Sequence, residues 1–457
     1  MVVEVTEAVA NLISLIAKEI KDNIAADKIA AELDQYYYWK VDGFAYTDKG
    51  VSYTHMSGAY TNQKNWLRAQ MILLPIIKES AEFKNLVGVL RQFCPLRTTP
   101  EADAARVVYH LMDVYFTRKQ AEYTGAFASI LYRLINDLHD EPQKISVQLN
   151  LEGITIGSRS IQLTPTATLR QTLQSDIEIP KEVSMRVSGM YHDTHNHPSA
   201  ILETEFELSQ SPDEKSLRPI DLQGLIIKYV VMLRLYAVGS VDYLSYSMNC
   251  NAILPNTTIG GVVSYSNKES SFIKYYVPSE DEQRLIEFMR LIDPLVPKDL
   301  YHHEKKTTFL TIAYDRYSDA LLEKGIFEKR VSNAVMGLEA IYSNENLELA
   351  YKLRQRIAKT MSHFGKQPID LLDVVKDAYA IRSTFAHGGL SEKKDRNRIL
   401  KRYISDQNFI ISILDVLRIS IVACIRYKLE KEIFIKLLDE AMIDEAKGNE
   451  LQELLTG

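Results

Sequence analysis

The residues most able to do chemistry are arginines followed closely by a histidine. In metal-free RNA cleavage, a neutral imidazole near pH 7 takes the proton of the attacking 2′-hydroxyl. A guanidinium stabilises the negative charge that develops on phosphorus. The spacing by itself is weak evidence in a chain with ten histidines. It occurs at Arg133–His139, Arg186–His192, Arg356–His363 and Arg382–His387.

The surroundings favour Arg382–His387. A helical pattern runs up to His387 and meets Gly388 and Gly389, a signal for a helix C-terminus. Residues five apart on a helix point about 140° apart, so a helix that ends at His387 lets the imidazole turn back toward Arg382. The structural alternative is a histidine stabilised by the helix dipole and an arginine paired with a nearby acid. We predict Arg382 and His387 as the catalytic residues.

Basic residues follow this pair, with Asp395 as the one acid among them. We expect a loop here that binds RNA phosphates; the alternative is a solvated turn before the next helix. The basic residues are Lys393, Lys394, Arg396, Arg398, Lys401 and Arg402, of which the first four are the predicted RNA-binding set.

A second group of possible chemical residues has the look of a zinc site. It consists of His192, Asp193, His195 and His197. The JAMM metalloprotease pattern would need Ser and Asp where Glu205 and Leu208 stand, and the metallo-β-lactamase pattern also fails. We therefore predict a polar loop without metal. Neither a glycine-rich phosphate loop nor a G-x-S-x-G motif occurs, and we expect no cofactor.

Bulk composition is that of a soluble globular protein. The 457 residues exceed one hydrophobic core, and two to four domains are expected. The net charge of −6 disfavours a protein that coats nucleic acid, although a local basic patch is compatible with it. Cys94, Cys250 and Cys424 are far apart, which predicts buried thiols in a reducing compartment.

Two apolar stretches require a check for membrane spanning. Leu222–Leu244 and Phe409–Ile425 are both interrupted by charged residues, and we interpret them as buried helices. The N-terminus lacks the basic start and the cleavage site of a signal peptide. We expect a cytoplasmic protein with no membrane association.

Periodicity along the chain predicts an α+β multidomain fold. We expect a helical domain over 1–143, a β-rich, mixed domain over 144–300 and an all-α helical bundle over 301–457. Strands are expected at Ile145–Leu151, Ser160–Thr164, Val183–Tyr191 and Ile201–Leu208. The bundle is expected to have four main helices, over 313–343, 346–362, 369–386 and 402–440. Aromatic residues between Tyr36 and Tyr60 suggest core and turn packing, with base stacking as the alternative.

Three runs in the last third of the chain resemble the Apea-like HEPN family. They are Asn333–Tyr342, Glu348–Ala358 and Tyr379–Gly388, and the third carries the family's Arg…His motif. The resemblance implies an HEPN-like helical bundle that forms a homodimer and joins two Arg–His pairs in one cleft. It also implies a metal-independent endoribonuclease with RNA as its substrate, often a toxin or an antiviral defence effector in bacteria.

One position departs from the family pattern. Active members often have Asn, Asp or His directly after the arginine, and this chain has Ser383. The alternative function is therefore a catalytically silent HEPN module for dimerisation or for binding a ligand or protein. In either case the N-terminal region is expected to sense a phage-derived or cellular trigger.

Overall fold

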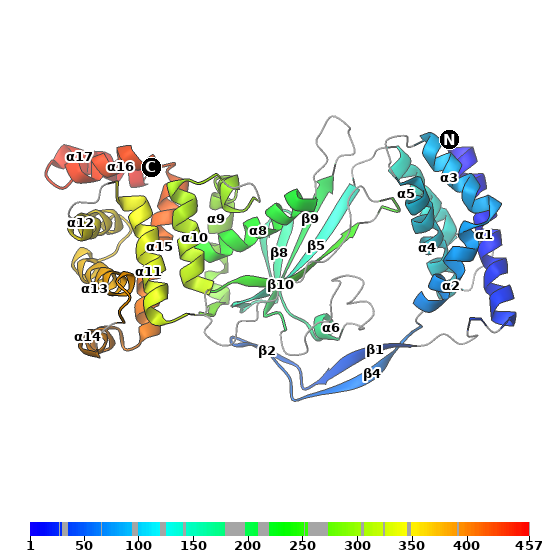
Figure 1. The fold of residues 1–457 in the computed structure, drawn as a ribbon, viewed down its shortest axis with the longest axis horizontal. Helices are drawn as coiled ribbons and strands as arrows, with labels where there is room; N and C mark the ends of the chain where they lie inside the picture. The colour runs from blue at the N-terminus through cyan, green and yellow to red at the C-terminus, as the bar shows by residue number, and fades with distance from the viewer. Residues whose placement is uncertain are drawn as a thin grey trace.

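The computed structural model describes the chain except residues 27, 30–34, 65, 94–98, 119–124, 140–142, 179–196, 209–218, 251, 255–272, 303–305, 323–324, 345–348, 391–392 and 457. Figure 1 shows helices of the N-terminal region at one end, a sheet in the centre and the C-terminal helices at the other end. The mixture of helices with a small sheet region and a C-terminal helical stretch confirms the coarse part of the predicted fold.

The described N-terminal helices lie within the predicted helical region, 1–143, and share a buried apolar cluster. The cluster includes Leu12, Leu73, Leu86 and Leu134, all fully buried. These side chains recur on one face of each helix, as a helical period requires. The helices are α1 (Val2–Ala25), α2 (Leu67–Lys78), α3 (Ala81–Phe93), α4 (Pro100–Arg118) and α5 (Gly125–Leu138).

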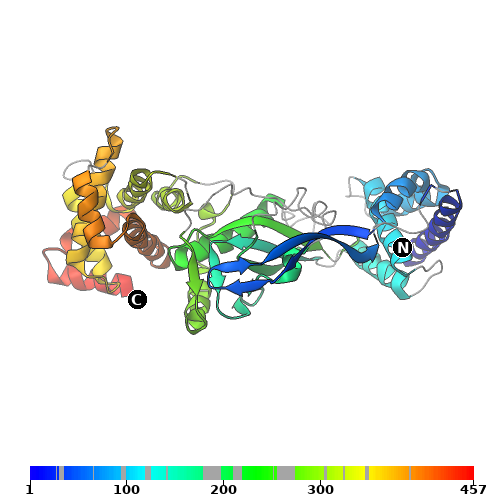
Figure 2. The ribbon, with the colours of Figure 1, turned by 90° about the horizontal axis from the view of Figure 1, so that it is seen from below.

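A two-stranded ribbon interrupts this helical region between α1 and α2. The antiparallel strands β1 (Gln35–Asp42) and β4 (His55–Lys64) form it, and the hairpin of β2 (Ala45–Thr47) and β3 (Gly50–Ser52) lies between them in sequence. The ribbon runs from the N-terminal helices toward the sheet (Figure 2). Among the aromatic residues of this segment, Tyr38, Tyr46 and Tyr53 are half-buried and Tyr60 is exposed, and the expected core and turn packing stays a prediction.

The central sheet has five antiparallel strands in the order β10-β5-β9-β8-β7. Alternate residues of β5, such as Ile145 and Leu149, are buried, as predicted for a strand with one apolar face. The strands are β5 (Gln143–Glu152), β7 (Ser160–Thr164), β8 (Ala167–Gln171), β9 (Ala200–Leu208) and β10 (Asp242–Cys250). Sequence reasoning missed β8 and β10, and the expected strand over 183–191 lies outside the described residues.

Shorter elements and two helices complete the centre. A parallel pair of short strands lies beside the sheet, and α8 lies across it in Figure 1. These elements are β6 (Ile154–Ile156), α6 (Gln174–Ile177), α8 (Pro219–Tyr236), β11 (Tyr275–Val277), η1 (Ser279–Asp281), α9 (Glu282–Ile292) and η2 (Lys298–Leu300).

The C-terminal region is helical, but its helices are more numerous than predicted. The expected helix over 313–343 is two helices, as is the one over 402–440. The basic segment predicted as a loop is instead the helix α14. The helices are α10 (Phe309–Leu322), α11 (Phe327–Tyr342), α12 (Leu349–Ser362), α13 (Pro368–Ala386), α14 (Lys393–Tyr403), α15 (Asp406–Arg426), α16 (Lys431–Glu440) and α17 (Glu445–Thr456).

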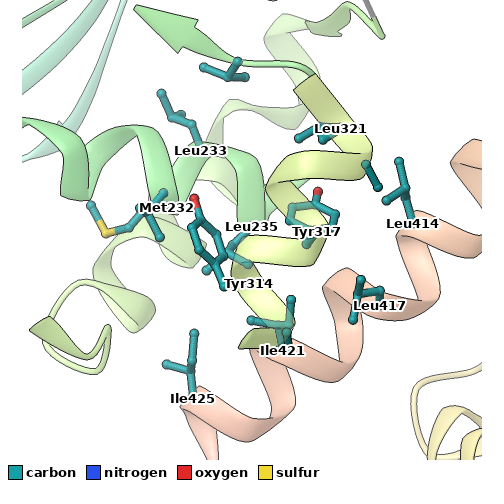
Figure 3. Packing of buried hydrophobic residues seen from close by; sticks show 14 of the residues in the cluster. Met232, Leu233, Leu235, Tyr314, Tyr317, Leu321, Leu414, Leu417, Ile421 and Ile425 are labelled. Atoms are coloured by element: carbon teal, nitrogen blue, oxygen red, sulfur yellow. The ribbon is translucent and has the colours of Figure 1, made fainter. Parts of the chain in front are cut away.

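One apolar cluster joins the sheet to the C-terminal helices. Figure 3 shows Leu233 of α8, Tyr317 of α10 and Leu417 of α15 converging at this junction, and all three are fully buried. The Tyr317 hydroxyl also donates a hydrogen bond of 2.9 Å to the carbonyl of Arg234. The predicted division at residue 300 stays a prediction, since the buried cluster is continuous across it.

The helix α15 is long and apolar enough to cross a membrane by length and composition alone, and 61% of its most apolar window is buried inside the protein. Charged residues in this helix form ion pairs with other side chains of the protein. Arg418 pairs with Asp415 at 2.7 Å, and Asp415 also accepts from Lys366 at 2.7 Å. These contacts satisfy the charges that interrupt the apolar stretch.

Candidate active site

The helix α13 ends where the sequence predicts. Gly388 has φ +80°, a left-handed conformation that glycine adopts without steric cost. The Gly388 amide donates to the carbonyl of Phe385, and the Gly389 amide donates to the carbonyl of Thr384, both at 3.0 Å. His387 is the last residue before this turn, and its side chain is exposed. The imidazole is therefore accessible to a large substrate such as RNA.

Arg382 lies one and a half turns earlier on the same helix, and its guanidinium points toward α11. It pairs with Glu339 at 3.1 Å and lies over the ring of Tyr379, 5.9 Å from the ring centre. The side chain is 29% exposed, so part of it is accessible to solvent. Among the described residues, no hydrogen bond joins Arg382 to His387, although one helix carries both.

Glu339 is the residue of this site that sequence reasoning did not single out. Its side chain is 15% exposed. Burial raises the pKa of its carboxyl, and the charge and hydrogen bond of Arg382 offset only part of this effect. Its other oxygen, Oε1, is buried without a hydrogen-bond partner in the described part of the chain. A single acid within an apolar helical run, Val335–Tyr342, was the signal that could have identified it.

The predicted RNA-binding residues lie on α14, where acidic residues hold most of the described side chains. Arg396 pairs with Asp406 and Arg398 pairs with Asp377 at 3.0 Å. Lys393 and Lys394 occupy the first turn of α14, and their side chains lie outside the described part. The expected loop is wrong, because this segment is a helix. The fully buried Ile399 anchors the helix, but its apolar face is too narrow to be recognised among the charged residues of the sequence.

Ion pairs show how α14 lies relative to α13. Arg398 of α14 pairs with Asp377 of α13. One turn further along α14, Arg402 pairs at 2.8 Å with Asp373, which lies one turn earlier on α13. The two helices therefore run in opposite directions, and the first turn of α14 faces the end of α13 that carries His387. Asp377 precedes His387 by ten residues, which is about 15 Å along a helix. This distance is within the reach of a few nucleotides of RNA.

A surface cavity of about 810 Å³ lies along α14. It is lined by Asn397, Arg398, Lys401 and Arg402. Three of these four residues are cationic, so the cavity suits an anionic ligand such as a phosphate backbone.

The other three Arg–His spacings have different surroundings. Arg356 is 1% exposed and is bound by Asp439 and by the carbonyl of Tyr342, so it has a structural role. Arg186–His192 lies outside the described residues. His139 directly follows α5 and is exposed, as His387 is after α13. An exposed histidine after a helix is thus no proof of catalysis.

The predicted polar loop around His192, His195 and His197 is described only in its last part. The His197 imidazole lies 3.1 Å from the hydroxyl of Tyr53, between β3 and β4, and is edge-on to its ring. In the described part of the chain, no group of three His, Cys, Asp or Glu side chains could hold a metal ion. The absence of a metal at 191–198 stays a prediction.

Of the predicted buried thiols, Cys424 is confirmed. It lies in the interior of α15, and burial raises the pKa of its thiol to about 12. Cys250 is half-buried, and Cys94 lies outside the described residues. The two described thiols are neutral at physiological pH and are poor nucleophiles.

No known family model, curated protein or solved structure matches this chain.

Proposed function

We propose that the protein is a metal-independent endoribonuclease of the HEPN type, with Arg382 and His387 as its catalytic residues. One observation carries the proposal. The two side chains lie at the exposed end of one helix, and the guanidinium is held in place by Glu339. The helix α14, with its basic residues, runs alongside and supplies cations for the RNA backbone.

The reaction would proceed within the RNA. The His387 imidazole takes the proton of a 2′-hydroxyl, whose oxygen forms a bond to the adjacent phosphorus. The bond from phosphorus to the 5′-oxygen breaks, and that oxygen takes the proton back from the His387 imidazolium, which returns to its neutral form. Arg382 stabilises the additional negative charge on the phosphoryl oxygens. The products carry a 2′,3′-cyclic phosphate and a 5′-hydroxyl.

A homodimer through the C-terminal helices completes this proposal. In a single chain the imidazole and the guanidinium are separate, and a two-fold symmetric pair would place a second Arg–His set opposite the first. The family resemblance motivates this arrangement. If it is correct, light scattering at micromolar concentration should give the mass of a dimer. Cytoplasmic RNA would be the target, in antiviral defence or toxin action, with the N-terminal region as the sensor of a phage-derived or cellular trigger.

A silent HEPN-type binding module is the second candidate, and the ion pairs favour it. Glu339 neutralises Arg382, while Asp377 and Asp406 neutralise Arg398 and Arg396. RNA would have to compete with these acids for the cations. Ser383, which departs from the pattern of active family members, points the same way.

The deciding experiment compares RNA cleavage by matched histidine variants. Purified wild type, His387→Ala and His139→Ala are incubated with total RNA in EDTA. We expect wild type and His139→Ala to cleave equally, because His139 has the same position after a helix but lies at the other end of the molecule. His387→Ala should lose at least about 10²-fold in rate. Fragments should end in a 2′,3′-cyclic phosphate.

Two results would favour the binding module. One is intact RNA with wild type even when the trigger is present in a cell extract. The other is equal cleavage by His387→Ala and wild type. Cleavage that EDTA abolishes would contradict the metal-free mechanism.

A further inference from the structure

A second cavity lies at the junction of the sheet region and the C-terminal helices, away from His387. Its volume is about 620 Å³. Four helices contribute to it: the end of α8, the start of α13, the end of α14 and the middle of α15. Junctions between structural units are preferred places for small-molecule sites. Neither the catalytic pair nor the predicted RNA-binding set lines this cavity.

Fixed cations form one part of its wall. Arg418 donates to the carbonyls of Leu235 and Tyr236 at the end of α8, at 2.8 and 2.9 Å. Its guanidinium also binds Asp415, which accepts a third contact from Lys366 at 2.7 Å. Burial alone would raise the pKa of the Asp415 carboxyl, but Arg418 and Lys366 outweigh it and hold that pKa below its ordinary value. Asp415 therefore remains ionised at neutral pH, and the two cations exceed it by one charge.

The surplus positive charge is confined to the side of the cavity that Lys366 and Arg418 form. Arg402 also lines the cavity but is paired with Asp373 at 2.8 Å, and Asp370 adds a negative charge elsewhere in the lining. Lys366 is 41% exposed, so its ammonium can contact a ligand without leaving Asp415. An anionic group of a ligand would therefore bind at Lys366, beside Arg418.

Apolar side chains and two aromatic rings form the rest of the wall. They are Leu371, Val374, Ile411, Val416, Tyr236 and Tyr403. Burial raises the pKa of both tyrosine hydroxyls, which therefore stay protonated and able to donate hydrogen bonds. Rings and aliphatic side chains together suit a flat, apolar group.

We infer that this cavity binds a small organic anion with a flat heteroaromatic body, of the size and chemistry of a nucleoside monophosphate. The phosphate would contact Lys366, beside the fixed Arg418, and the base would pack between the apolar side chains of α13 and α15. The cavity is larger than inorganic phosphate needs, and the cations make a neutral nucleoside a poorer ligand.

The position of the cavity gives the ligand a regulatory role, which rests on the proposed function. Asp370 and Leu371 line the cavity at the first turn of α13, and Arg382 lies near the other end of this helix. A ligand that contacts both α8 and α13 would brace the catalytic helix against the sheet region. Binding itself does not require that the protein cleave RNA.

Isothermal titration of the full chain with AMP tests the inference. We expect one site per chain. Lys366→Ala should weaken AMP binding about 10-fold, as expected when a charged hydrogen bond is lost. Lys359→Ala is the matched control, since Lys359 lines a different cavity of about 570 Å³, and it should bind AMP as wild type does. Ser412→Trp, which fills the cavity from α15, should abolish binding.

Several results would overturn the inference. The first two are the absence of AMP binding at millimolar concentration and equal AMP binding by wild type and a folded Ser412→Trp variant. The other two are adenosine that binds as tightly as AMP and inorganic phosphate that competes as well as AMP. His387→Ala should bind AMP normally, so a failed nuclease assay and a failed binding assay remain distinguishable. Melting curves of Lys366→Ala and Ser412→Trp confirm that each variant is folded.

Discussion

Arg382 and Glu339 depend on each other at the residue scale, in a way that the sequence did not predict. Arg382 and His387 both lie near the end of a helix, and from this position alone we would expect Arg382→Ala and His387→Ala to leave the free energy of unfolding unchanged. The structure separates them, because Arg382 is the partner of a buried carboxylate and His387 is exposed.

We therefore predict that Arg382→Ala lowers the free energy of unfolding by about 1 kcal/mol, the typical cost of leaving a buried acceptor unpaired. His387→Ala should leave it within about 0.5 kcal/mol. Adding Glu339→Gln to Arg382→Ala should recover much of the loss, because the unpaired charge is then absent. Urea denaturation of wild type, Arg382→Ala, Glu339→Gln and the double variant measures this cycle. Strictly additive effects of the two substitutions would contradict the coupling.

Glu339 should also affect the dependence of stability on pH. Its pKa is raised in the folded state above the ordinary value of 4.5, so above that pH the folded chain binds more protons than the unfolded chain. Its contribution to stability is therefore largest at low pH and decreases as the pH rises through the raised pKa. Glu339→Gln should flatten the slope of unfolding free energy against pH just above 4.5. An unchanged slope in urea titrations would contradict this prediction.

At the scale of elements, the end of α13 depends on Gly388. Alanine at φ +80° is strained, and we expect Gly388→Ala to destabilise the protein by about 1 kcal/mol. Gly88 offers the opposite control. It is exposed within α3 with space for a methyl group, and Gly88→Ala should stabilise by up to about 1 kcal/mol. Thermal denaturation measures both, and equal shifts would show that the turn is not strained.

Sequence reasoning was most accurate where apolar periodicity and end signals agree. Apolar periodicity predicts helices over Leu67–Ile77, Glu82–Phe93 and Ala126–Leu138, and α2, α3 and α5 lie within one residue of these limits. The helix α13 lies within one residue of its predicted range, 369–386, because Pro368 and Gly388 mark its two ends. Sequence reasoning failed for α14, whose charged residues obscure one buried face around Ile399. It also failed for β10, whose serine and tyrosine residues follow directly on the apolar run of α8.

The candidate site shows a similar limit. Positions of Arg382 and His387 at a helix end could be predicted, because local sequence determines where a helix stops. The contact with Glu339 could not, since it joins residues 43 positions apart through the packing of α11 against α13. The ion pairs of Arg396 and Arg398 were hidden for the same reason.

At the scale of the whole molecule, two separate apolar cores predict two unfolding events. One core belongs to the N-terminal helices, and the other joins the sheet to the C-terminal helices. We expect two calorimetric transitions. Leu12→Ala should lower only one of them, and Leu417→Ala only the other, each by about 2–5 kcal/mol for a buried leucine.

The second core is continuous from the sheet to the C-terminal helices, which distinguishes one folding unit from two. Leu149→Ala in the sheet should lower the same transition as Leu417→Ala, because both leucines belong to one cluster. Three transitions, or separate shifts for these two variants, would instead support independent domains divided near residue 300.

The ribbon of β1 and β4 has a mechanical consequence. The chain leaves the N-terminal helices through β1 and returns through β4, then crosses again from α5 to β5. The far end of the ribbon is hydrogen-bonded to the central region, where Thr155 donates to the carbonyl of Asp48 and Tyr46 accepts from the amide of Ile156. The α5–β5 connection is a second tie, and a third lies where Ile253 and Leu254 pack into the core of the N-terminal helices, with the Leu254 amide donating to Asp137 of α5 at 2.7 Å. A force on the N-terminal helices would therefore be shared among these ties instead of bending the chain at a single hinge.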